Sequence, residues 1–324
     1  MSASVTVADP LDSQPPPDRP AYATGMLLDA RDFLDEQTYH RGRLARALMQ
    51  VAGSGTLAGL RVWHQTAIAS GEATRPEEIR VDPGLAVDRL GRLIELPRPA
   101  CLGLPRWWEA EMARDGGDSL RQAAYGNLAR FISARAASGL NLPERAVVAD
   151  VFIGFYACPR GLTPAFAQGP FDALNAVSTS RVRDAYELRM YLRPGLDDGF
   201  SGLPLPAGSV AIPGETAAEA AAREAAMGDP GADPAAHRAA LQDSVLYGYT
   251  PRGEGGSIDE GAGALAPSAE HPLGADTSSI FLARVLIPVE SGNPPIRNAQ
   301  AVLIDNYSRR FLPGVAMLAR WNGY

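Results

Sequence analysis

The stretch LLDARDFLDEQTYHRGRLARALMQVAG, Leu27 to Gly53, is the clearest helix in the sequence. Acidic residues crowd its first half and arginines its second half, which is the order that the helix macrodipole favours. Asp29 is placed to cap the start, with Asp32 three positions later in the capping-box position. Gly53 suits a left-handed cap at the end. We therefore predict one long N-terminal helix over residues 25–53.

Apolar residues recur along this helix in alternating steps of four and three, the heptad pattern of one helix packing against another. Two polar residues interrupt the pattern in mid-helix, where a purely structural core would prefer leucine. Two interpretations stay open: the stripe packs on the sheet of its own domain, or it is a self-associating seam whose polar residues set the register. We call the stripe the helix seam, and its members are Met26, Phe33, Gln37, His40, Leu44 and Val51.

After a glycine-rich turn the sequence changes to β character. LRVWH, residues 60–64, predicts one strand. IRVDPGLAVDRLGRLIELP, residues 79–97, predicts an antiparallel meander, because Asp82-Pro83-Gly84 presets a turn between alternating apolar residues. From residue 104 the spacing of apolar residues becomes helical, with a break at Gly116-Gly117, which predicts two joined helices.

Four later runs have strand composition. The continuous apolar run over 147–157 predicts a central strand covered on both faces, and the alternation over 182–194 predicts a half-exposed strand. Residues 279–290 and 301–313 predict two more strands, separated by a Pro-Pro turn.

The intervening residues are dominated by Ala, Gly and Pro. Short helices are predicted over 216–227 and 234–246, whereas residues 252–268 offer too little apolar burial to offset their ordering entropy; we expect residues 250–275 to be mobile. The fold class is therefore α+β: a long N-terminal helix on a mainly antiparallel β domain, with a helical insert and a flexible insertion. The predicted segments are a disordered arm 1–24, the helix 25–53, a β domain 54–200 with its insert at 104–145, the insertion 201–278, and closing strands 279–324.

Composition excludes several functions. All 30 basic residues are arginine, so Schiff-base chemistry and a phosphate-binding P-loop lysine are ruled out. The net charge of −7 without a basic run argues against nucleic acid as the main partner. No apolar run suits a membrane span or a signal peptide, so we expect a protein made in the cytoplasm, either staying there or joining an assembled particle. Cys101 and Cys158 are expected to be two buried thiols in preference to a bridge.

No cofactor or metal site is expected. The glycines at 53, 55 and 59 follow a helix instead of preceding one, so no helix N-terminus faces a phosphate. The histidines, His40, His64, His237 and His271, share no metal-ligand spacing with one another or with a cysteine.

The acid pairs, the two adjacent tryptophans and Arg309-Arg310 each have a structural and a functional interpretation. The acid pairs Asp184 with Glu187, and Asp197 with Asp198, are expected at the surface and would serve glycosidic chemistry only across a cleft. Of Trp107-Trp108, one side chain should face the core and the other a groove, where it could stack on a sugar.

Arg309-Arg310 should place one arginine inward on a strand. That guanidinium needs a carboxylate, with Asp305 or Asp88 as candidates, and we favour a structural ion pair over substrate binding.

The order of segments resembles uncharacterised proteins encoded in phage-tail-like contractile injection system clusters. Three blocks carry the resemblance: GMLLDARDFLDEQTYHRGRLARAL (25–48), GTLAGLRV (55–62) and IRVDPGLAVDRLGRLIEL (79–96). The segments SRVRDAYELRM, FLARVLI and IDNYSRRFL fit the same kind of protein, and the matched blocks cover about half of the chain.

The resemblance implies a non-catalytic tail or baseplate component whose partners are other tail or baseplate proteins, or copies of itself. Such particles are built from symmetric rings, where a seam with polar register residues is useful. The alternatives are a surface-glycan binding module or glycan hydrolase of the same particle, and an ordinary cytoplasmic protein whose similarity is accidental.

Overall fold

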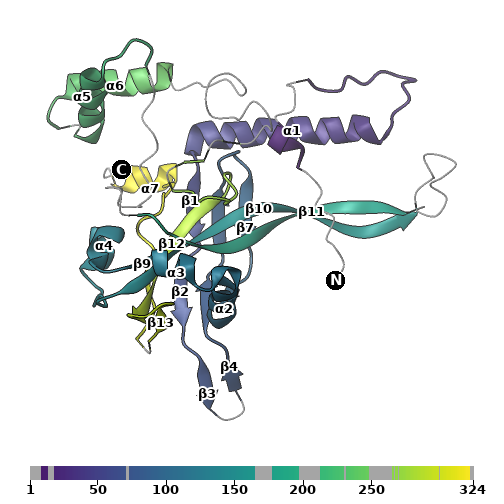
Figure 1. Ribbon diagram of the computed structural model, residues 1–324. Coiled ribbons are helices and arrows are strands. Elements are labelled where there is room, and N and C mark those ends of the chain that lie inside the picture. The colour runs from purple at the N-terminus through teal and green to yellow at the C-terminus, as the bar shows by residue number, and fades with distance from the viewer. Residues whose placement is uncertain are drawn as a thin grey trace. The chain divides into compact units, whose positions relative to one another are not determined.

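The computed structural model has the α+β architecture that the sequence predicts (Figure 1). The chain divides into two compact units: Met1–Pro204 with Pro267–Tyr324, and Leu205–Ala266. None of the helices in the described part of the chain combines the length and the apolar character needed to cross a lipid bilayer. The structure describes residues 9–13, 18–70, 73–164, 177–196, 212–229, 231–247, 265, 267–268, 270–298 and 300–321.

The first unit is built around one antiparallel sheet. Its central strand is β10 (Ala146–Pro164), which pairs with β11 (Val177–Leu192) on one side and β12 (Ile280–Glu290) on the other. Residues 146–154 of β10 are all buried, so the predicted central strand is confirmed. Short strands complete the sheet: β9 (Ala124–Tyr125), β13 (Ile296–Arg297) and β14 (Leu303–Asp305).

The predicted meander is shared between two smaller sheets. β6 (Gly84–Val87) and β7 (Leu93–Leu96) pair as expected, with β1 (Gly55–Gly59) beside β6. The strand before the Asp-Pro-Gly turn, β5 (Glu78–Val81), instead pairs with β2 (Val62–Gln65) and β8 (Ala100–Gly103). The turn therefore moves the chain from one sheet to the next. A separate hairpin joins β3 (Ile68–Ser70) to β4 (Ala73–Arg75).

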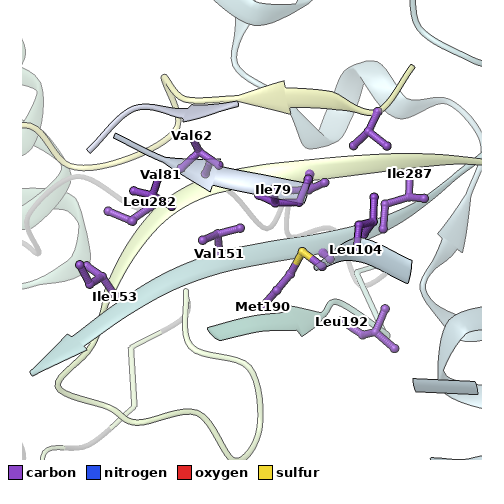
Figure 2. Close-up of a cluster of buried hydrophobic side chains, with 14 of the residues drawn as sticks. Val62, Ile79, Val81, Leu104, Val151, Ile153, Met190, Leu192, Leu282 and Ile287 are labelled. Carbon is purple, nitrogen blue, oxygen red and sulfur yellow. The ribbon is translucent and has the colours of Figure 1, made fainter. Parts of the chain in front are cut away.

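One hydrophobic core joins the β2–β5–β8 sheet to the central sheet (Figure 2). Complete burial of each such aliphatic side chain contributes about 1.5–3 kcal/mol. Figure 2 shows side chains from both sheets meeting in one layer, among them Val62, Ile79, Val81, Val151, Ile153, Met190, Leu192, Leu282 and Ile287.

The helical insert begins as predicted and then departs from the prediction. α2 (Leu104–Asp115) and α3 (Asp118–Gln122) are separated by Gly116 and Gly117, which both have positive φ. The rest of the insert contains β9 and the short η2 (Leu128–Phe131) and α4 (Ala134–Ala137) instead of a continuous second helix. Leu120, Leu128 and Phe131 are nevertheless buried, so the apolar residues of the pattern do form core.

Helix α1 (Ala30–Ala52) has the predicted start. The Asp29 side chain accepts hydrogen bonds from the Arg31 and Asp32 backbone N–H groups, and the Asp32 carboxylate accepts one from the Asp29 N–H. Gly53 ends the helix with φ +78° and ψ −164°, which is not the left-handed cap expected. Met26 precedes the helix, so the first member of the helix seam is not helical.

Parts of the predicted arm and insertion belong to the first unit. η1 (Pro10–Ser13) holds Asp9 and Leu11 buried within the expected disordered arm. Glu270, His271 and Ser278, expected in the insertion, are buried as well. Arm residues 1–8 and 14–17, and residues 250–264, 266 and 269 of the expected mobile segment, lie outside the described residues.

The second unit contains the two short helices predicted there, α5 (Ala217–Gly228) and α6 (Pro234–Leu246), which pack on each other. At the C-terminus, of the predicted strand 301–313 only β14 forms. Helix α7 (Val315–Trp321), which the sequence did not predict, follows it.

Candidate interaction surface

One face of α1 is held against the β domain. Thr38 and Ala45 are buried on this face, with 6% and 3% of their surface exposed. The turn between β6 and β7 approaches so closely that a Cβ on Gly91 would lie 1.9 Å from the carbonyl oxygen of Ala45. Only glycine leaves room for the helix backbone at this point.

A buried charge cluster adds to this contact. Asp9 accepts hydrogen bonds from Arg41 of α1 at 3.1 Å and from Arg92 at 3.3 Å. Arg92 also donates to Asp88 at 2.6 Å and to Asp12 at 2.7 Å. The Asp9, Asp88 and Arg92 side chains are buried, so breaking the pairs among them is costly. Arg41, whose side chain is 37% exposed, joins α1 to this cluster through Asp9.

The helix seam lies on a different face of α1 and is exposed. Phe33, Leu44 and Val51 expose 49%, 62% and 85% of their surface, Met26 exposes 43%, and Gln37 and His40 are exposed too. Thr38 and Ala45 each follow a seam residue by one position, which turns the anchored face about 100° away from the seam. The interpretation that the seam packs on its own sheet is therefore wrong. That the seam associates with another molecule stays a prediction.

The apolar surface extends beyond the seam that the sequence pattern identified. Leu27 and Leu34 expose 94% and 51% of their surface beside it. At the other end of α1, Leu312 lies 3.8 Å from the Cβ position of Gly53, and α7 starts three residues later with Val315 80% exposed. The heptad pattern could not reveal α7, because its seven residues are too few to show periodicity.

Of the two acid pairs, the structure describes Asp184 with Glu187, and it does not bring these two carboxylates to one face. Asp184 and Glu187 are exposed on β11, and because they are three residues apart on a strand they point to opposite faces. Glu187 instead forms an ion pair with Arg189 at 2.9 Å. Asp197 and Asp198 lie outside the described residues.

The two tryptophans both pack on the core, so the expected division between core and groove is wrong. Trp107 donates its indole N–H to the Met190 carbonyl oxygen at 2.9 Å. The Arg297 guanidinium lies 5.8 Å from the centre of the Trp108 ring.

Arg309 is the inward arginine, but its partners are not carboxylates. It donates to the carbonyl oxygens of Leu60 at 2.7 Å and Asn306 at 3.0 Å. Burial lowers the pKa of Arg309 to about 10, although Asp305 acts in the opposite direction. Arg310 pairs with Glu270 at 3.0 Å, and Asp88 is taken up by Arg92. All these contacts are structural.

The histidines and cysteines are separate from one another. His64 pairs with Glu77 at 2.9 Å and His237 contacts the Ala226 carbonyl oxygen, so each has its own partner. Within the described ranges, no group of three or more His, Cys, Asp and Glu side chains could hold a metal ion. Both cysteines are free; Cys101 is exposed, which contradicts the expectation of a buried thiol, and Cys158 is half-buried.

No protein-family model matches the chain, and no curated protein shows significant similarity to it. The resemblance to contractile injection proteins therefore stays a prediction.

Proposed function

We propose that the chain is a non-catalytic structural component of a phage-tail-like contractile injection particle, made in the cytoplasm and associated with the tail or baseplate. Its contact surface for other tail or baseplate proteins, or for copies of itself, is the helix seam. The sequence resemblance supplies the kind of particle, and the exposed seam supplies the physical reason for assembly.

The observation that carries the proposal is an exposed apolar stripe on an anchored helix. Contiguous exposed apolar surface marks interaction sites in soluble proteins. Because another face of α1 is fixed by the Asp9 cluster and by Gly91, the seam is presented in one orientation and loses little conformational entropy on binding. A helix face presented in this way suits insertion into a groove or pairing with another helix.

Gln37 and His40 fit the same role. Both are exposed in the middle of the seam, where leucine would give more apolar contact. In helix–helix interfaces, single polar residues fix register and partner number at a cost in stability. We expect them to select the correct partner and not to strengthen the contact.

The test is the composition of purified particles. The gene cluster is expressed with this chain carrying either Phe33→Asp with Leu44→Asp, or Arg43→Asp as the control; Arg43 is exposed on α1 but outside the seam. The seam variant should be lost from the particles or prevent their assembly, and the control should be incorporated normally. Particles that contain no copy of the unmodified chain, or that incorporate the seam variant as well as the control, would contradict the proposal.

A further inference from the structure

A two-stranded ribbon extends beyond the central sheet. β12 pairs with β10 only as far as Ile153, and beyond that point β10 and β11 pair only with each other (Figure 1). We call the outer part, residues 158–164 and 177–183, the hairpin arm. An isolated two-stranded hairpin is marginally stable in water, so such an arm gains stability when it docks on something.

One face of the hairpin arm is strongly basic. Arg160 lies directly opposite Arg181 in the strand register, and Arg183 is two residues further along the same face. All three are exposed, and no described carboxylate lies within ion-pair distance of them. Like charges directly opposite each other destabilise a ribbon. Leu162, with 75% of its surface exposed, lies on the same face, which we call the arginine face.

A matching surface is present on α1. Asp29, Asp32 and Glu36 follow one another at steps of three and four residues, so they share one side of the helix with Phe33. Their carboxylates cap the helix or accept the Tyr22 hydroxyl, and each retains free lone pairs for further donors. We call these four residues the acidic face.

We propose that the arginine face of one copy docks on the acidic face of a second copy. Each face offers three like charges and one exposed apolar side chain, and the charges are opposite in sign. The two faces also have similar lengths. Arg183 is paired with Cys158, so the arginine face runs from Cys158 to Leu162, which is about 13 Å along the strand. The acidic face runs from Asp29 to Glu36, which is about 10 Å along the helix. Guanidinium–carboxylate pairs between the two faces would attract the two copies and also fix their relative orientation.

The contact joins two different surfaces, so repeated copies form a ring or an open filament, and two copies that exchange both contacts form a dimer. The inference rests on the proposed function in that it treats the chain as an assembling subunit. It adds a contact that does not require the centre of the helix seam, since Leu44 and Val51 lie outside the acidic face.

Sedimentation equilibrium of the full chain at low salt, over a wide concentration range, tests the contact. Arg160→Glu with Arg181→Glu and Arg183→Glu should weaken self-association more than about tenfold, because like-charge juxtaposition is strongly unfavourable. Arg61→Glu with Arg98→Glu and Arg106→Glu is the matched control, since these arginines are exposed elsewhere and the net charge changes equally. Equal weakening by both triple variants, or an unmodified chain that is monomeric throughout, overturns the proposal.

A charge exchange makes the test specific. Asp32→Arg with Glu36→Arg should also abolish self-association. A mixture of this variant with the Arg160→Glu, Arg181→Glu, Arg183→Glu variant should associate again. Because Asp32 belongs to the helix cap, Glu36→Arg alone serves as the second variant, and circular dichroism verifies the fold of each. No association in the mixture of two folded variants overturns the proposal. If Leu44→Asp then still removes the chain from particles, the proposed function stands without this contact.

Discussion

Arg284 donates two hydrogen bonds to Asp150, at 2.7 and 2.8 Å, from the directly paired position on the neighbouring strand. Their side chains are 0% and 1% exposed, in the middle of the central sheet. A third hydrogen bond joins Arg284 to the Phe131 carbonyl oxygen, and Arg193 lies 3.3 Å from the same aspartate. The central sheet thus contains a buried, fully hydrogen-bonded ion pair among mainly aliphatic side chains.

Arg284→Met should lower the free energy of unfolding by about 3–5 kcal/mol, because it leaves the Asp150 carboxylate buried beside a single weaker partner. Arg284→Met with Asp150→Leu should cost less than the single change. Urea unfolding measures both, and Arg121→Met in the exposed Arg121–Asp118 pair is the control, with an expected cost below about 1 kcal/mol. A single variant as stable as the control would show that the pair contributes nothing.

Gly91→Ala should detach α1 from the β domain. Its Cβ would overlap the Ala45 carbonyl oxygen, and the residue also has φ +83°. Gly195→Ala is the control, since φ is +73° but the space around it is open. We expect the control to cost about 1–2 kcal/mol from backbone strain, and Gly91→Ala to cost about 1–3 kcal/mol more from overpacking. Thermal and urea unfolding give the difference, and equal costs would mean that the helix adjusts freely.

Leu44→Ala should barely change the stability of the dissociated chain, by less than about 0.5 kcal/mol, because the side chain is mostly exposed. Leu282→Ala, in the core, should cost about 2–5 kcal/mol. If the seam binds another copy, Leu44→Ala should lower the melting temperature only at high protein concentration. A large loss for Leu44→Ala in dilute solution would place the seam inside the monomer.

His271 should make stability depend on pH. Burial lowers its pKa, and the neutral ring is held between the Ser268 hydroxyl at 2.7 Å and the Ser279 carbonyl oxygen at 3.1 Å. Below about pH 6.5 the unfolded chain binds a proton that the folded chain does not. The contribution of His271 to the free energy of unfolding should therefore be fully present above that pH. It should decrease as the pH falls towards the lowered pKa of the folded state.

His271→Gln should flatten this dependence between about pH 7.5 and 5.5. His40→Gln, at an exposed position, should leave it unchanged. Urea unfolding at several pH values makes the comparison. If the free energy of unfolding depends on pH equally in the His271 variant and the unmodified chain, His271 is not the cause of the dependence.

The sequence predicted the elements whose signals are local. The cap at Asp29, the central strand over 147–157 and the break at Gly116-Gly117 depend only on neighbouring residues. Periodicity also placed the helical members of the seam, from Phe33 to Val51, on one side of α1, although Met26 precedes the helix. It could not tell which side faces the β domain, because a small face of Thr38 and Ala45 suffices when glycine and buried charges provide the contact.

The buried charges required information from distant residues. Asp150 and Arg284 each interrupt an apolar strand run, so opposite charges in two central strands were the available signal for their pairing. Asp9 had no such signal, since its partners are Arg41 and Arg92, and a proline-rich terminus has the composition of a disordered arm. Arg309 was assigned a carboxylate because backbone carbonyl partners leave no trace in a sequence.

The position of the second unit between β11 and β12 has a consequence for synthesis of the chain on the ribosome. After Leu192 emerges, 87 residues must be translated before Ile280 begins the strand that completes β10. At about 5–20 residues per second, one edge of the central strand β10 stays uncovered for roughly 4–17 s. Exposed edges of that kind recruit other nascent chains. The yield of folded protein should therefore depend on chaperones and translation speed more than its final stability would suggest.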